Sequence, residues 1–103
     1  MFNVKKINSE ELIEWKNINK EFQFIDIRKN KPAINFHYSE IVIPYDEIQE
    51  NISKLKKEIP VILACDVGEQ SFFSAATLKN KYNFDNIYTL RGGINDLKKQ
   101  LLL

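Results

Sequence analysis

The chain has little of several residue types on which whole classes of protein depend. It contains a single cysteine, so no disulfide can form within it, and we expect a reducing compartment, the cytoplasm. One cysteine and one histidine do not supply a familiar set of metal ligands, so we expect no metal and no cofactor. There is no internal repeat, no low-complexity stretch and no linker.

Long apolar runs and a surplus of one charge are also absent. No run approaches the length that spans a bilayer, and charged residues interrupt the N-terminus where a signal peptide would be apolar. The net charge of +1 gives no general attraction to nucleic acid or to anionic membranes, so neither is an expected partner.

What remains is an ordinary globular composition. The 103 residues, 44% of them hydrophobic and 28% charged, fit one domain spanning 1–103. Short apolar runs typical of strands alternate with apolar residues at helical spacing. Strands are expected at 2–7, 22–27, 41–43, 60–64 and 86–90, and helices at 8–17, 45–59, 71–82 and 94–103. Such alternation predicts an α/β domain with a parallel sheet.

The only cysteine lies where such a domain places its ligands. Cys65 directly follows the continuous apolar run 60–64, and binding sites of open α/β sheets lie beyond the carboxyl ends of the strands. The loop after it leads into a helix, whose first N–H groups and dipole favour a negative charge. We therefore expect the thiol to lose its proton more easily than a free one. Gly68 allows the loop to bend, and Ser71 is a candidate helix cap.

Four stretches, in this order, carry a resemblance to a known family. They are "FIDIR" at 24–28, "IVIPYDEI" at 41–48, "VILACDVGEQS" at 61–71 and "IYTLRGGINDL" at 87–97. Together they resemble the rhodanese-like domain over nearly the whole chain. The matching positions are Asp26 and Arg28, His37, Ile43 and Pro44, Cys65 with Gly68 and Ser71, and Leu90, Gly92, Gly93 and Ile94.

The resemblance implies a mostly parallel sheet of about five strands with helices on both faces, and a sulfurtransferase chemistry. Cys65 would take sulfane sulfur as a persulfide and pass it to a nucleophilic acceptor. Backbone N–H groups of the loop would hold the sulfur, and its residues are Asp66, Val67, Gly68, Glu69, Gln70 and Ser71. Asp26 and Arg28 would brace the loops as an ion pair, and Gly92 and Gly93 would form a required turn.

The loop departs from the family members that use thiosulfate. Those members commonly have basic residues at the positions of Asp66 and Gln70, and Glu69 adds a second negative charge here. Because two carboxylates oppose a small dianion, we expect free thiosulfate to be a poor donor. A protein persulfide delivered by a cysteine desulfurase is the expected donor. The loop is similar to those of rhodanese domains fused to activating enzymes of the MoeB/ThiF type, which serve sulfur carriers in molybdopterin, thiamine and tRNA-thiolation pathways.

Several plainer interpretations stay open at this point. Cys65 could be a buried structural thiol, since free cysteine is among the most buried residue types. The alternative is a domain that has lost its chemistry and serves as a docking or regulatory module. His37 is better explained as a loop histidine than as a catalytic base, and Arg91 could return positive potential to the pocket. Related phosphatases need an arginine where this chain has Ser71, so phosphatase activity is not expected.

Overall fold

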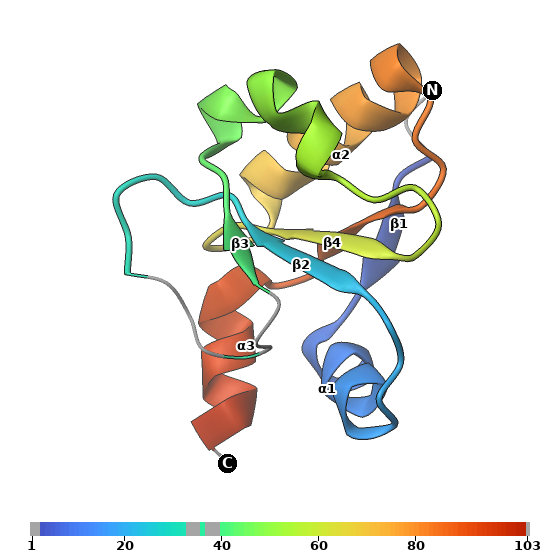
Figure 1. The fold of residues 1–103 in the computed structure, drawn as a ribbon. Helices are drawn as coiled ribbons and strands as arrows, with labels where there is room; N and C mark the ends of the chain where they lie inside the picture. The colour runs from blue at the N-terminus through green and yellow to red at the C-terminus, as the bar shows by residue number, and fades with distance from the viewer. Residues whose placement is uncertain (1–2, 33–35, 37–39, 103) are drawn as a thin grey trace.

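A five-stranded sheet forms the centre of the molecule (Figure 1). The computed structural model describes residues 3–32, 36 and 40–102. All strand pairs are parallel, in the order β1-β5-β4-β2-β3. The strands are β1 (Lys5–Ile7), β2 (Gln23–Asp26), β3 (Ile41–Val42), β4 (Val61–Ala64) and β5 (Ile87–Leu90). The predicted α/β fold with a parallel sheet of about five strands is confirmed.

Strand β4 occupies the middle of this sheet, which explains its unbroken apolar sequence. All four of its residues are buried, because helices cover both of its faces. It pairs with β2 on one side, where Ala64 lies opposite Asp26, and with β5 on the other, where Leu63 lies opposite Thr89. The chain leaving β4 at Cys65 therefore emerges between the ends of β2 and β5.

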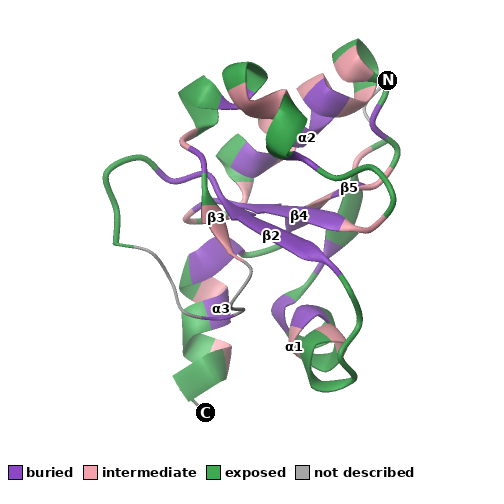
Figure 2. Cartoon of the chain, in the orientation of Figure 1, coloured by how far each residue is buried: buried purple, intermediate pink, exposed green. Residues whose placement is uncertain are grey.

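Helices cover the two faces of the sheet, as the resemblance implied (Figure 1). Helices α1 (Ser9–Asn17) and α3 (Gly93–Leu102) lie on one face, and α2 (Glu69–Tyr82) lies on the other. Figure 2 shows the buried residues along the sheet and the inner sides of these helices. The sheet thus separates two apolar clusters, one containing Leu63, Ala75 and Leu78 and the other containing Leu12, Ile62 and Leu97.

The first helix begins where the sequence predicts it, and the choice between Asn8 and Ser9 as its cap is settled. The Asn8 side chain accepts a hydrogen bond from the Glu11 N–H, and the Glu11 carboxylate accepts one from the Asn8 N–H. This reciprocal pair satisfies two N–H groups that the helix itself cannot bond. Ser9 instead donates to Asp96 at 2.7 Å and so connects α1 to α3.

The prediction of one helix over 45–59 is wrong in both the type and the length of the helix. The chain forms two 3₁₀ helices, η1 (Tyr45–Glu47) and η2 (Gln49–Lys54), and is already extended at Leu55. Asn51 has non-helical backbone angles, and its side chain donates to the Glu47 carbonyl, which competes with a regular helix. Ile48 and Leu55 are buried. The apolar spacing therefore indicated correctly which side of this segment faces the core.

The remaining predictions differ from the structure by a few residues at element ends. The described part of the 28–40 segment contains neither helix nor strand, as predicted. Helix α2 begins at Glu69, two residues earlier than expected, which shortens the loop after Cys65. Within the described residues, no helix is both long and apolar enough to cross a membrane.

Candidate active site

Main-chain hydrogen bonds from the start of α3 hold Cys65 in place. The Ile94 N–H donates to the Cys65 carbonyl at 2.7 Å, and the Asn95 N–H donates to the Asp66 carbonyl at 3.1 Å. The cysteine side chain is buried, at 6% exposure. The first turn of α3 therefore fixes the two peptide units that directly follow Cys65.

Two backbone N–H groups converge on the sulfur of Cys65. The Gly68 N–H donates to Sγ at 3.1 Å, and the Ser71 N–H donates to Sγ at 3.3 Å. The Ser71 hydroxyl oxygen lies 3.5 Å from the same atom. Hydrogen bonds to a charged acceptor are stronger than those to a neutral one, so these two N–H groups are placed to stabilise a negative charge on the sulfur during a reaction. It is a geometry that a merely space-filling thiol would not need.

The loop reaches this geometry because Gly68 adopts a left-handed conformation, with φ of +100°. Gly68 is the residue before the first turn of α2, and no side chain caps that helix. The prediction that Ser71 caps the helix is wrong, since Ser71 lies inside the first turn. Its N–H, which has no carbonyl to bond within the helix, is directed at Cys65 instead.

The Ser71 hydroxyl, which lies next to the sulfur, forms a buried pair with the hydroxyl of Thr89, a residue that the sequence did not indicate. Ser71 Oγ and Thr89 Oγ1 are 2.5 Å apart, and Ser71 Oγ also donates to the Gly68 carbonyl at 3.3 Å. Both residues are at most 2% exposed. Thr89 lies near the carboxyl end of β5, and a polar residue at that position of an apolar strand was the available signal. The pair fixes the first turn of α2 against the sheet.

Gly93 permits the loop to pack directly against the β5–α3 turn. Its φ is +69°, and a Cβ at this position would lie only 2.3 Å from the Asp66 carbonyl oxygen. The glycine is therefore required for the close approach of two main chains as well as for the turn. Gly92 beside it also has a positive φ.

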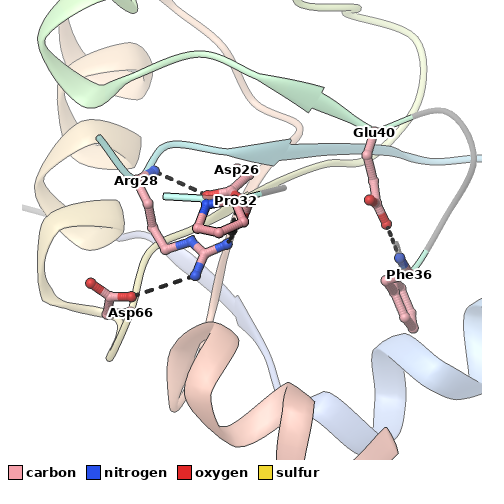
Figure 3. Close-up of polar contacts among 6 residues, drawn as sticks. All are labelled: Asp26, Arg28, Pro32, Phe36, Glu40 and Asp66. Atoms are coloured by element: carbon pink, nitrogen blue, oxygen red, sulfur yellow. Dashed lines mark hydrogen bonds and ion pairs between the residues drawn. The ribbon is translucent and has the colours of Figure 1, made fainter. Parts of the chain in front are cut away.

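On the β2 side, charged side chains hold the loop (Figure 3). The Arg28 guanidinium donates to both carboxylate oxygens of Asp26, at 3.0 and 2.9 Å, and to the Pro32 carbonyl at 2.9 Å. Its other terminal nitrogen lies 3.7 Å from an Asp66 carboxylate oxygen. The predicted Asp26–Arg28 ion pair is thus present, and it extends to the loop.

Because Asp26 and Arg28 are both buried, each charged side chain depends on the other for its neutralisation. Both side chains are almost fully buried, whereas the Asp66 side chain is 45% exposed. The hydrogen bond to Asp26 raises the pKa of Arg28 above its ordinary value, and burial opposes it only in part. The three residues include one more carboxylate than guanidinium, so the cluster as a whole stays negative. The pairing of Asp66 was not foreseen, because nothing in the sequence places the end of β2 beside residue 66.

The family model of the rhodanese-like domain matches residues 9–100, which includes every element from α1 to nearly the end of α3. The chain belongs to the rhodanese-like domain family. None of the curated proteins matches the sequence closely enough to count as a relative. Solved structures do match it, and three of them differ in how much of their own length the match covers.

A NAD-dependent persulfide reductase from A. fulgidus aligns with a TM-score of 0.74 and 25% identity over 90% of this chain. That alignment covers only 16% of the reductase, so this chain spans about a sixth of its length. A rhodanese-related protein from Thermoplasma volcanium aligns with a TM-score of 0.70 and 24% identity, covering 93% of this chain and 92% of its own. A rhodanese homolog from Thermus thermophilus aligns with a TM-score of 0.69 and 23% identity, covering 90% and 100%.

The other residues predicted for the site of this rhodanese-like domain lie at its surface. Val67, Glu69 and Gln70 are exposed, and no hydrogen bond or ion pair of their side chains with another described residue is found. Of the loop residues, only Gly68 and Ser71 contact the sulfur within hydrogen-bond distance. His37 lies outside the described residues. The described residues also contain no group of three metal-ligating side chains.

An open cleft of about 460 Å³ lies beside the loop, on the side of β5. Its lining includes Gly68, whose N–H donates to the sulfur, and Thr89, whose hydroxyl contacts that of Ser71. The other lining residues are Lys6, Val67, Glu69, Phe72, Phe73, Leu90, Arg91 and Gly92. Of these residues, the sequence pointed only to Arg91 as a source of positive potential.

Proposed function

We propose that this rhodanese-like domain accepts sulfane sulfur on Cys65 as a persulfide and transfers it to a nucleophilic acceptor. The observation that carries the proposal is the pair of N–H groups, from Gly68 and Ser71, that reach Sγ at 3.1 and 3.3 Å. The 25% identity to a NAD-dependent persulfide reductase agrees with persulfide chemistry. An inactive docking module would not need donors directed at its only thiol.

Both transfers use the same two donors. In the first, the Cys65 thiolate attacks the outer sulfur of a donor persulfide, the donor's S–S bond breaks, and the donor cysteine leaves as a thiolate. In the second, an acceptor attacks the outer sulfur on Cys65, and Cys65 leaves as a thiolate. Gly68 and Ser71 hydrogen-bond Sγ when it carries charge, both before the first step and after the second. No oxidant or reductant is consumed.

The charges around the loop support a protein donor over free thiosulfate. The Asp26–Arg28–Asp66 cluster is negative, and the exposed Glu69 carboxylate adds to it. A small dianion is repelled by these groups, whereas a cysteine desulfurase carrying a single persulfide brings its own surface to the site. The acceptor belongs, in this proposal, to the sulfur carriers and adenylating enzymes of molybdopterin, thiamine or tRNA thiolation in the cytoplasm.

Intact-protein mass spectrometry tests the proposal. After incubation with a cysteine desulfurase and cysteine, the domain should gain about 32 Da, the mass of one sulfur atom as a persulfide. Thiosulfate in place of the desulfurase should give much less of this product, because of the carboxylates. Addition of dithiothreitol should remove the added mass.

The Cys65→Ser variant is the matched control and should gain nothing. If the wild type stays unmodified with the desulfurase and also with thiosulfate, the sulfur-carrier proposal is wrong, and a docking module becomes the better explanation. Efficient loading from thiosulfate would instead refute the role assigned to the carboxylates.

A further inference from the structure

The thiol of Cys65 must place a proton as well as accept hydrogen bonds. The N–H groups of Gly68 and Ser71 can only donate to Sγ. Among the described residues, the one oxygen within hydrogen-bond distance of Sγ is the Ser71 hydroxyl, at 3.5 Å, and no carboxylate or imidazole reaches that atom. The thiol therefore donates its proton to Ser71 Oγ.

Thr89 carries a hydroxyl where the neighbouring side chains are apolar. It pairs with Leu63 in the register of β4 and β5, and Leu63 and Ile87 both belong to the apolar cluster beneath α2. A buried hydroxyl costs stability unless it is hydrogen-bonded, and Thr89 Oγ1 has Ser71 Oγ as its partner at 2.5 Å. Valine would fill the same space without that requirement. The hydroxyl therefore indicates a role beyond packing.

The two hydroxyls form a chain from the buried sulfur to the open cleft. Ser71 is fully buried, whereas Thr89 lines the cleft. A hydroxyl donates one hydrogen bond and can also accept, so the chain can run in either direction. Outward, Sγ donates to Ser71 and Ser71 donates to Thr89. Inward, Thr89 donates to Ser71, and the Ser71 hydroxyl becomes a third donor to the sulfur.

We propose that Thr89 is a positioning residue that turns the Ser71 hydroxyl toward the charged sulfur of Cys65, and that the thiol proton leaves through these two hydroxyls. The inference rests on the proposed function, because it concerns the thiolate that attacks the donor persulfide. When Cys65 loses its proton, Ser71 Oγ loses the donor that it had, and the Thr89 hydroxyl replaces it.

The Gly68 carbonyl is the competing partner for the Ser71 proton, at 3.3 Å from Ser71 Oγ. That carbonyl is neutral, whereas the sulfur of the thiolate is charged and forms the stronger hydrogen bond. Donation from Thr89 polarises the Ser71 hydroxyl and strengthens the bond that it donates. Together these effects favour the inward direction once the sulfur is charged.

The proton transfer is balanced. The S–H bond of Cys65 breaks, its electron pair stays on Sγ, and Ser71 Oγ gains the proton while passing its own to Thr89 Oγ1. Thr89 passes its own proton to a water molecule in the cleft, which becomes hydronium. Both hydroxyls remain intact, and their protons now point toward the sulfur. Loss of the proton along this route therefore leaves the chain in its inward direction.

Charged side chains also face this region, from the cleft and from the loop. Within the described part of the chain, none of them is hydrogen-bonded to either hydroxyl. Replacing a hydroxyl leaves these charges in place, so differences between hydroxyl variants report the hydroxyls themselves. The charged residues are Lys6, Glu69 and Arg91 in the cleft, and Asp66 with its partner Arg28 in the loop.

Alkylation by the neutral reagent iodoacetamide tests the inference without sulfur transfer. The rate follows the thiolate fraction, so between about pH 5 and about pH 10 it rises to a plateau. On the rising part, Thr89→Val should react about fivefold more slowly than the wild type, which is the effect of one hydrogen bond. At the plateau it should react at least as fast, because every thiol is then charged. Thr89→Ser keeps the hydroxyl and should stay within about twofold of the wild type throughout.

Thr77→Val is the matched control, because the Thr77 hydroxyl, also on α2, donates to the Phe73 carbonyl and does not contact the sulfur. It should leave the alkylation profile unchanged. Ser71→Ala should be slow on the rising part, and adding Thr89→Val to it should cause little further loss, because Thr89 acts through Ser71. Thr89→Ala gives the same comparison if the valine variant does not fold.

Three results would overturn the inference. The first is a wild-type alkylation profile for Thr89→Val. The second is a lowered plateau in that variant, which would show that the loop had merely moved. The third is additive losses in the double variant, which would show that Thr89 acts independently of Ser71.

Persulfide loading by a cysteine desulfurase then separates this inference from the proposed function. At a pH on the rising part of the profile, Thr89→Val should load more slowly than the wild type by a similar factor. If no donor loads even the wild type while the alkylation rates differ as expected, the proposed function is wrong and the inference on Thr89 holds. If the wild type loads and the alkylation profiles coincide, the inference on Thr89 alone is wrong.

Discussion

The chain's two arginines lie on opposite sides of the Cys65 loop and are used in opposite ways. Arg28, at the end of β2, is almost fully buried and has all its partners within the molecule. Arg91, at the end of β5, is exposed, and its guanidinium has no partner among the described residues. The strand that carries Cys65 to the site, β4, lies between β2 and β5.

The two sides also hold the loop by different means. On the β2 side the contact is a side-chain ion pair, from Arg28 to Asp66. On the β5 side it is main chain to main chain, from Ile94 and Asn95 to the carbonyls of Cys65 and Asp66. Because the backbone supplies that support, the Arg91 side chain is not needed to hold the loop. The Arg28 side chain, in contrast, is committed to the fold.

Replacing each arginine with alanine tests this contrast most strongly. Arg28→Ala leaves the Asp26 carboxylate buried without its partner and should lower the free energy of unfolding by about 3–5 kcal/mol. Arg91→Ala should change it by less than about 0.5 kcal/mol, as exposed substitutions do. Urea unfolding followed by circular dichroism measures both.

If the Arg28→Ala variant does not fold, Arg28→Lys keeps the charge but loses the two parallel hydrogen bonds, and it should give a smaller loss of stability. Equal stability of the Arg28 and Arg91 variants would remove the distinction between a structural and a free arginine.

Two glycine substitutions probe the main-chain support on the β5 side. Gly93→Ala combines a left-handed backbone with a Cβ placed 2.3 Å from the Asp66 carbonyl oxygen. It should cost more than about 2 kcal/mol of unfolding free energy, and persulfide loading should fall with it. Gly68→Ala has comparable backbone strain, but its nearest contact is 3.3 Å. It should cost about 1–2 kcal/mol.

The same unfolding measurement ranks the two glycine variants. Gly93→Ala must be the less stable of the two if the close approach of the Gly93 and Asp66 main chains contributes to the loss of stability in addition to the strained backbone of the turn. Equal losses would show that only the backbone conformation is important.

The sequence was sufficient for the parts of the fold that depend on local pattern. A continuous apolar run located β4, a shorter and mostly apolar stretch located β5, and the position of Cys65 directly after β4 placed it at the carboxyl edge of the sheet. The 45–54 segment was mistaken for one helix because apolar spacing shows which face is buried but not whether the hydrogen bonds are α or 3₁₀.

The rest of the site depends on contacts between distant residues. Nothing local to Arg28 or Asp66 indicates that they meet, and Thr89 reaches Ser71 only because β4 and β5 are neighbours. The cleft is lined by residues of β1, α2 and the end of β5, so its lining could be recognised only in three dimensions.

The central claim is that the N–H groups of Gly68 and Ser71 hold a charged sulfur, and amide NMR tests it most directly. In ¹⁵N-labelled protein, the amide protons of these two residues should shift downfield together as Cys65 loses its proton with rising pH. The shift should be absent in Cys65→Ser. If the two amide signals do not respond while the thiol titrates, the sulfur is not held by these donors, and the account of the site is wrong.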